Sequence, residues 1–259
     1  MAIALITGAS KGIGLALARL MAEYGHDLVL VARSKERLSQ LQSELTSTYA
    51  ISVFSINADL SQSEAPTHIF TQLSQQNIFP DILINNAGLG DVALFSEANL
   101  EKQKQMIALN INCLTELTYL FLQQRRQGKQ YWLLNIASTA AFLPGPSMSV
   151  YYASKAYVLH FTEALAEECK QSNVSVSAFC PGPVATDFQV SANMPKAKGL
   201  KKSLLLSAEE AAKFAYKAIF DTKVVVVPSF KNRMAVWLAS LLPRKLAMRA
   251  VFKSNELSG

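Results

Sequence analysis

The sequence predicts a single α/β domain over residues 1–259, with a doubly wound, seven-stranded parallel sheet flanked by helices. Two observations predict it. Short apolar runs rich in β-branched residues alternate with longer segments of helical period, and no internal repeat or Gly/Ser-rich linker divides the chain. Apolar runs without polar alternation are typical of parallel strands, which are buried on both faces. The runs cover residues 2–6, 28–31, 53–56, 82–84, 131–136, 174–179 and 224–227.

The first strand is expected to lead into a helix, because Ile13, Leu17, Leu20 and Tyr24 share one face and Gly25 suits the left-handed conformation that ends a helix. The turn between them is rich in glycine, and its bare N–H groups and the positive helix end suit a pyrophosphate. Its spacing departs from GxGxxG, and such glycines also occur in ordinary turns. The turn residues expected to contact a dinucleotide are Gly8, Ser10, Lys11, Gly12, Ile13 and Gly14.

The end of the second strand favours a phosphorylated cofactor. An acidic residue that binds the ribose of NAD would lie there, but the chain has Ala32 followed by Arg33. Arg33 and Lys11 together could hold a 2′-phosphate, so we expect NADP(H); two solvated surface cations are the simpler alternative. After the third strand, Asp59 and Leu60 are expected near the adenine.

Tyr151 and Lys155 are the candidate catalytic pair. Of eight tyrosines, only Tyr151 is followed four residues later by a lysine, so the two share a helix face. A nearby ammonium favours the phenolate and lowers the pKa of a tyrosine, which would make Tyr151 a usable general acid/base. The spacing alone also fits a packed tyrosine beside a snorkelling lysine. Ser138, at the end of the fifth strand, could polarise a carbonyl oxygen.

In order and spacing, these motifs resemble those of the short-chain dehydrogenase/reductase family, over essentially the whole chain to about Pro228. The family's TGxxxGxG turn matches residues 7–14, its NNAG motif matches residues 85–88, and its YxxxK motif matches Tyr151 and Lys155. The resemblance implies a Rossmann-type fold and a homodimer or homotetramer. One departure is Ala137, where many members carry a second serine that does no chemistry.

The resemblance also implies roles that spacing alone does not. It makes Asn110 a fourth catalytic residue, on a kinked helix that holds a proton-relaying water. The implied reaction is hydride transfer from NADPH to a ketone or aldehyde, with Tyr151 supplying the proton and Lys155 also holding ribose hydroxyls. Further cofactor contacts are implied for Asn86, Ala87, Gly88, Pro181, Gly182, Val184 and Thr186.

A weaker similarity links the chain to 3-oxoacyl thioester reductases and hydroxysteroid dehydrogenases, which suggests a small carbonyl substrate, including an acyl thioester or a steroid-like molecule. The alternative is a non-catalytic dinucleotide-binding or membrane-associated scaffold, because a fold does not guarantee a function. The four intact residues Asn110, Ser138, Tyr151 and Lys155 argue against a scaffold.

The composition bears on disulfides, metal binding, cellular location and nucleic-acid partners. Three widely spaced cysteines suggest neither a disulfide framework nor a metal site, and no basic leader precedes the first strand, so we expect a cytoplasmic protein. Of 25 Lys/Arg, 13 lie in residues 196–259, against 4 of 19 acids. This basic region lacks the aromatic pattern of nucleic-acid binders, so no nucleic-acid partner is expected.

Two segments in the C-terminal part of the chain combine basic and apolar residues. Residues 187–206 are expected to form the substrate loop, where cations would suit an acidic carrier, although a solvated loop also fits. Its apolar and basic residues are Met194, Pro195, Lys196, Lys198, Lys201 and Lys202. Residues 231–259 are expected to form a basic amphipathic extension of two short helices around Pro243, with Trp237 on the apolar face. Residues 231–253 could touch an anionic membrane, cover the cleft or pack on a partner subunit.

Overall fold

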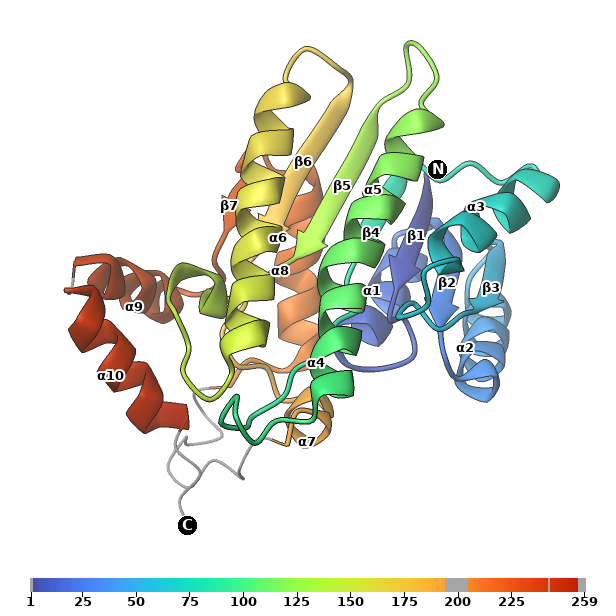
Figure 1. The fold of residues 1–259 in the computed structure, drawn as a ribbon. Coiled ribbons are helices and arrows are strands. Elements are labelled where there is room, and N and C mark those ends of the chain that lie inside the picture. The colour runs from blue at the N-terminus through green and yellow to red at the C-terminus, as the bar shows by residue number, and fades with distance from the viewer. Residues whose placement is uncertain (1, 194–204, 242, 256–259) are drawn as a thin grey trace.

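The seven strands form one parallel sheet in the order β3-β2-β1-β4-β5-β6-β7 in a computed structural model, which describes residues 2–193, 205–241 and 243–255. The doubly wound architecture and all seven predicted strands are confirmed (Figure 1). The strands are β1 (Ile3–Thr7), β2 (Asp27–Ala32), β3 (Val53–Asn57), β4 (Ile82–Asn85), β5 (Tyr131–Ile136), β6 (Val174–Phe179) and β7 (Val225–Val226).

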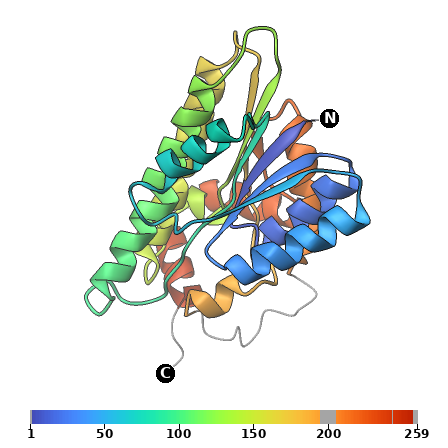
Figure 2. The ribbon, with the colours of Figure 1, turned by 90° about the vertical axis from the view of Figure 1, so that its right-hand side faces the viewer.

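Helices cover both faces of the sheet. Helices α1, α2 and α8 pack on one face, and α3, α5 and α6 pack on the other, as Figure 2 shows from the side. The helices are α1 (Gly12–Glu23), α2 (Lys35–Thr48), α3 (Ala65–Gln75), α4 (Leu100–Ile107), α5 (Leu114–Gln123), α6 (Ser149–Glu168), α7 (Phe188–Ser191), α8 (Ala208–Phe220), α9 (Phe230–Leu241) and α10 (Arg244–Asn255), with a π-helical turn η1 (Ala108–Cys113) and a 3₁₀ turn η2 (Thr139–Phe142).

The strands are apolar throughout because successive side chains enter two different cores. In β2, Leu28 and Leu30 pack under α1 and α2, whereas Val29 and Val31 pack under α3 and α5. All four side chains are buried. This burial on both faces explains why the strands carry no polar alternation.

Strands β1 and β4 are neighbours although two other strands separate them in sequence. The chain therefore changes direction across the sheet at this point, and the carboxyl ends of β1 and β4 leave a crevice between diverging connections. In such sheets, ligands bind in this crevice. The glycine turn follows β1, and the NNAG segment follows β4.

The first helix forms as predicted, but its buried face is that of Leu17, Ala18 and Met21, and Tyr24 is 59% exposed. Helix α1 ends at Glu23, and Gly25 adopts a left-handed φ of +77°. Helices α9 and α10 lie on either side of Pro243, as expected. None of the described helices is both long and apolar enough to cross a membrane. The basic part of the predicted substrate loop, from Met194 to Lys202, lies outside the described residues.

Candidate active site

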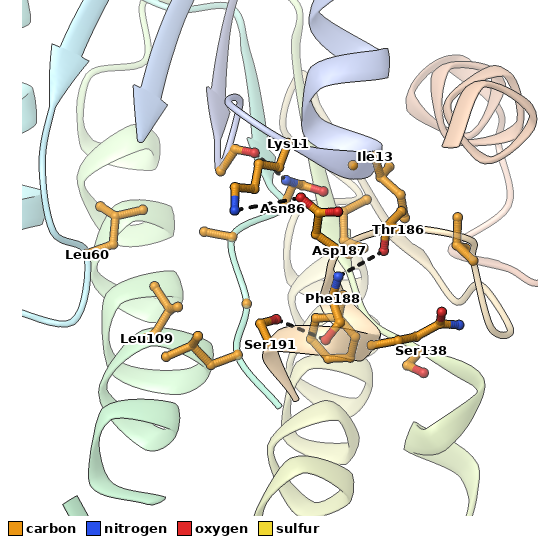
Figure 3. Close-up of a pocket in the computed structure, with 18 of the residues that line it drawn as sticks. Lys11, Ile13, Leu60, Asn86, Leu109, Ser138, Thr186, Asp187, Phe188 and Ser191 are labelled. Atoms are coloured by element: carbon orange, nitrogen blue, oxygen red, sulfur yellow. Dashed lines mark hydrogen bonds and ion pairs between the residues drawn. The ribbon is translucent and has the colours of Figure 1, made fainter. Parts of the chain in front are cut away.

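A cleft of about 750 Å³ lies at the carboxyl ends of the strands (Figure 3). It receives residues from the glycine turn, from the ends of β2 to β6 and from the start of α6. Two predicted site residues, Gly14 and Asn110, lie behind the lining. The predicted residues that line it are Gly8, Ser10, Lys11, Gly12, Ile13, Arg33, Asp59, Leu60, Asn86, Ala87, Gly88, Ser138, Tyr151, Lys155, Pro181, Gly182, Val184 and Thr186.

The glycine turn needs its glycines for two different reasons. Gly8 and Gly12 have φ values of +66° and +53°, a region that side chains with a Cβ rarely adopt. Gly14 has an ordinary φ, but a Cβ there would lie 2.4 Å from the carbonyl oxygen of Gly8. Gly14 therefore allows α1 to begin directly against the turn and does not itself face the cleft.

Thr7 and Asn86 join the two strands that flank the crevice. Asn86 Nδ2 donates to the carbonyl oxygen of Thr7 at 2.8 Å, and Thr7 Oγ1 accepts from the backbone N–H groups of Asn86 at 2.9 Å and Ala87 at 3.0 Å. Thr7 is buried. It is a supporting residue that the motif contained but that sequence reasoning did not assign to the site.

The sequence pairs Lys11 with Arg33 as candidate 2′-phosphate ligands, but in the structure Lys11 faces Asp187 and Arg33 is accompanied by Arg37. Lys11 Nζ lies 3.7 Å from Asp187 Oδ2 across the cleft (Figure 3), and both side chains are well exposed, so the pair is weak. Arg33 lines the cleft together with Arg37 from the first turn of α2. Within the described part of the chain, neither guanidinium pairs with a carboxylate. Arg37 was missed, although its spacing of four residues from Arg33 was a usable signal.

Asp59 and Leu60 line the cleft after β3, where the sequence places an adenine contact. Asp59 Oδ1 accepts from the N–H of Ser61 at 3.0 Å and from its hydroxyl at 2.8 Å. These bonds fix the carboxylate at the start of the loop. Leu60 is buried and provides an apolar wall.

Lys155 and Tyr151 project from the first turns of α6, and both side chains are buried. Lys155 Nζ donates to the carbonyl oxygen of Ile136 at 2.8 Å. Burial lowers the pKa of Lys155 to about 8 and raises the pKa of Tyr151 to about 12, against a weaker opposing hydrogen bond with Ser138. The pKa shift at Tyr151 is therefore opposite to the one expected from a neighbouring ammonium, and its largest cause is burial.

Ser138 lies two residues after the end of β5 and is the N-cap of the turn η2. Its hydroxyl oxygen accepts a hydrogen bond from the N–H of Ala140 at 3.1 Å. This bond occupies an acceptor site, and the hydroxyl proton is directed towards Tyr151, whose pKa the hydrogen bond with Ser138 lowers. Ser138 can therefore donate to an oxygen atom in the cleft.

Asn110 lies in the π-helical turn η1, between α4 and α5. Its Nδ2 donates to the carbonyl oxygen of Leu89 at 2.9 Å and to Ser154 Oγ at 3.0 Å, and its Oδ1 accepts from the Leu89 N–H at 2.9 Å. A Cβ added to Gly88 would lie 3.5 Å from both Asn110 Oδ1 and Lys155 Nζ. Asn110, within this local change of helix geometry, thus lies beside α6.

The segment after β6 brings in a residue that sequence reasoning missed. Phe188, at the start of α7, places its ring centroid 5.6 Å from that of Tyr151, and its ring projects into the cleft (Figure 3). Its N–H bonds to Thr186 Oγ1 at 3.3 Å. No periodicity or motif signals this contact, since it depends on how the loop after Thr186 folds back over α6.

Comparisons with known proteins agree with this geometry. A family model described as short chain dehydrogenase matches residues 2–197. The human 17-beta-hydroxysteroid dehydrogenase type 3 is 36% identical over 71% of this chain, and the match spans 59% of that relative's length. The very-long-chain 3-oxoacyl-CoA reductase of Anas platyrhynchos is 28% identical over 98% of this chain and 80% of its own.

A solved structure adds an independent comparison. The short-chain dehydrogenase from Sphingobium yanoikuyae in complex with NADPH matches with a TM-score of 0.81 at 29% identity, over 94% of this chain and 96% of that chain. The sheet order, the cleft at the strand ends and these matches all lead to one assignment. The chain belongs to the short-chain dehydrogenase/reductase family of oxidoreductases.

Proposed function

We propose that this protein is an NADPH-dependent reductase that converts a ketone or an aldehyde to an alcohol, with Tyr151 as general acid/base. The observation that carries the proposal is the convergence of Tyr151, Lys155 and Ser138 in one cleft, with Asn110 directly behind them. NADPH, when bound, supplies a hydride from C4 of its nicotinamide ring. A scaffold would not need these four side chains together.

The raised pKa of Tyr151 suits the direction of reduction. With a pKa of about 12, Tyr151 is protonated at neutral pH and can give its proton to the carbonyl oxygen when the hydride reaches the carbonyl carbon. Ser138 donates a hydrogen bond to the same oxygen. The product alcohol therefore gains one hydride and one proton, and Tyr151 recovers its proton from solvent past Lys155 and Asn110.

The preference for NADPH rests on residues at the end of β2 and just after it. Ala32 occupies the place of a ribose-binding acid, and Arg33 and Arg37 have no carboxylate partner among the described residues. A guanidinium binds a phosphate by a planar fork of donors, so this pair suits a 2′-phosphate. Lys11 joins them when its weak pair with Asp187 opens. Glycines 8 and 12 leave the backbone open to the pyrophosphate.

The walls beside Tyr151 favour an apolar substrate. The catalytic end of the cleft is lined by Leu89, Ala140, Met148, Tyr152 and Phe188. Such walls suit an acyl chain or a steroid-like body, in keeping with the names of the relatives.

We further propose a cytoplasmic enzyme that forms a homodimer or homotetramer. Exposed apolar side chains on α4 and α5 support subunit pairing; they include Leu100, Ile107 and Tyr119.

A rate assay tests the proposal directly. NADPH oxidation is followed with ketones, aldehydes and 3-oxoacyl thioesters, each also with NADH. We expect turnover of at least one bulky carbonyl compound, with higher kcat/KM for NADPH. Tight NADPH binding without turnover across all three substrate classes would favour a scaffold instead.

A further inference from the structure

We propose that helices α9 and α10 form a docking surface for an anionic lipid bilayer, with their apolar side chains in the headgroup layer. The surface consists of the outward residues of both helices and is called the tail surface below. Its members are Phe230, Lys231, Arg233, Trp237, Leu238, Leu241, Arg244, Lys245, Leu246, Met248, Arg249 and Phe252.

Helix α9 turns its large apolar residues away from the protein. Phe230, Trp237 and Leu241 are 68%, 55% and 63% exposed and lie on one stripe, at spacings of seven and four residues. The opposite stripe, which is more covered, carries Asn232 and Ala239. A helix that only packs on a core has the reverse arrangement, with its large apolar residues inside.

Cations border this apolar stripe. Each helical residue advances by about 100°, so Lys231 and Arg233 project on the two sides of the stripe. On α10, the exposed cations Arg244, Lys245 and Arg249 accompany exposed Leu246. Residues 231–253 contain no acidic residue. An apolar stripe with a cation on each side, next to a helix that carries three more exposed cations, matches a bilayer surface, where phosphates lie above the acyl chains.

A second copy of the chain fits the tail surface less well. In a symmetric dimer the same patch meets itself, so five exposed cations would face five others with no carboxylate among residues 231–253 to separate them. An anionic lipid surface supplies the opposite charge at every position. Charge complementarity therefore selects the lipid as the occupant.

The tail surface lies beside the active site. Helix α9 packs against η2, the turn that Ser138 begins, and a Cβ on Gly182 would lie 2.8 Å from the side-chain amide of Asn232. Figure 1 shows α10 extending towards the end of the molecule at which β5 and β6 terminate. Docking would thus bring the cleft close to the bilayer.

The experiment measures binding and needs no catalytic activity, so it is independent of the proposed function. The full chain is sedimented with vesicles of phosphatidylcholine alone and of phosphatidylcholine mixed with phosphatidylserine, at low and high NaCl. We expect co-sedimentation with the anionic vesicles at low salt, weakened at high salt. A chain that stays in the supernatant with anionic vesicles at low salt overturns the proposal.

Two triple variants separate the tail surface from general basicity. Arg244→Glu/Lys245→Glu/Arg249→Glu replaces three cations with carboxylates; the loss of each cation alone is worth about fivefold in binding, so partitioning should fall by at least roughly 100-fold. Lys213→Glu/Lys217→Glu/Lys223→Glu makes the same charge change at exposed sites on and after α8 and should retain most of the binding. Equal losses in the two triples would refute a specific surface.

An apolar variant and the subunit mass complete the test. Leu238→Asp/Leu241→Asp should abolish binding while the chain keeps the same thermal unfolding midpoint, because both side chains are exposed. Light scattering gives the subunit mass of each variant. If the tail variants split an oligomer and the unmodified chain ignores anionic vesicles, the surface is a subunit interface and the proposal fails.

Discussion

Lys155 Nζ lies 2.8 Å from the main-chain carbonyl oxygen of Ile136, to which it donates a hydrogen bond. Ile136 is the last residue of β5, two residues before Ser138. The bond therefore holds helix α6 against the strand that precedes Ser138. It also keeps a cationic side chain in a buried place, and burial lowers the pKa of Lys155 to about 8.

This lowered pKa predicts a pH-dependent stability. The free side chain has a pKa of 10.5, so between about pH 8 and about pH 10.5 the unfolded chain binds more protons than the folded chain. The contribution of Lys155 to stability rises with pH in this window and is lost as the pH falls towards 8. From about pH 8 to about pH 10, we expect the free energy of unfolding in urea to rise by about 2 kcal/mol more in the unmodified chain than in Lys155→Met. Parallel curves for the two proteins would show that Lys155 is not shifted.

Much of the fold could be predicted because strands buried on both faces must be apolar throughout. The strand positions agree to within one or two residues, and the residues at the strand ends then converge at one edge of a parallel sheet. This convergence explains the prediction for Ser138, whereas Tyr151 and Lys155 lie on a helix and were grouped with Ser138 by the order and spacing of motifs that resemble those of the family.

The features of the site that could not be predicted depend on contacts between segments that are distant in the sequence. Phe188 and Tyr151 touch because the loop after β6 folds over α6, and nothing local to either residue encodes that contact. The ion pair of Lys11 with Asp187 is similarly long-range. The direction of the pKa shift at Tyr151 was missed for the same reason, since burial is a property of the folded chain.

Tyr151→Phe should reduce kcat by roughly 10²- to 10⁴-fold, the usual contribution of a positioned proton donor. The ring remains, so packing against Phe188 and the dissociation constant for NADPH should change little. Steady-state rates and fluorescence titration with NADPH measure the two effects. Tyr157→Phe is the matched control, because Tyr157 is on the same helix and its hydroxyl contacts Thr115 outside the cleft. A normal kcat in Tyr151→Phe would remove that residue from the mechanism.

Arg33→Ala should lower kcat/KM for NADPH by at least about 10-fold, the usual value of a hydrogen bond to a charged group. The value for NADH should change less than about twofold, because NADH has no 2′-phosphate. Arg37→Ala should act in the same direction. Lys35→Ala, an exposed cation between them that does not line the cleft, is the control. If kcat/KM falls equally with NADPH and with NADH, Arg33 does not bind the 2′-phosphate.

Phe188→Ala should change substrate choice more than chemistry. The Phe188 ring packs beside Tyr151 and lines the cleft, so its removal opens space next to the reacting oxygen. We expect the ratio of kcat/KM for a bulky ketone to that for a small one to rise by about 10-fold. An unchanged ratio would place the substrate on another wall of the cleft.

Gly90 offers an independent test of where that ring lies. A Cβ at Gly90 would be 2.6 Å from Phe188 Cζ, so Gly90→Ala should cost about 1–3 kcal/mol of unfolding free energy by overpacking. In Phe188→Ala the obstructing ring is gone and the next neighbour, the Ala192 Cβ, is 3.3 Å away, so the same substitution should cost much less. Urea unfolding of the two single variants and the double variant measures this coupling. Additive effects would mean that Phe188 does not occupy this position, and the predicted change in substrate choice would lose its structural basis.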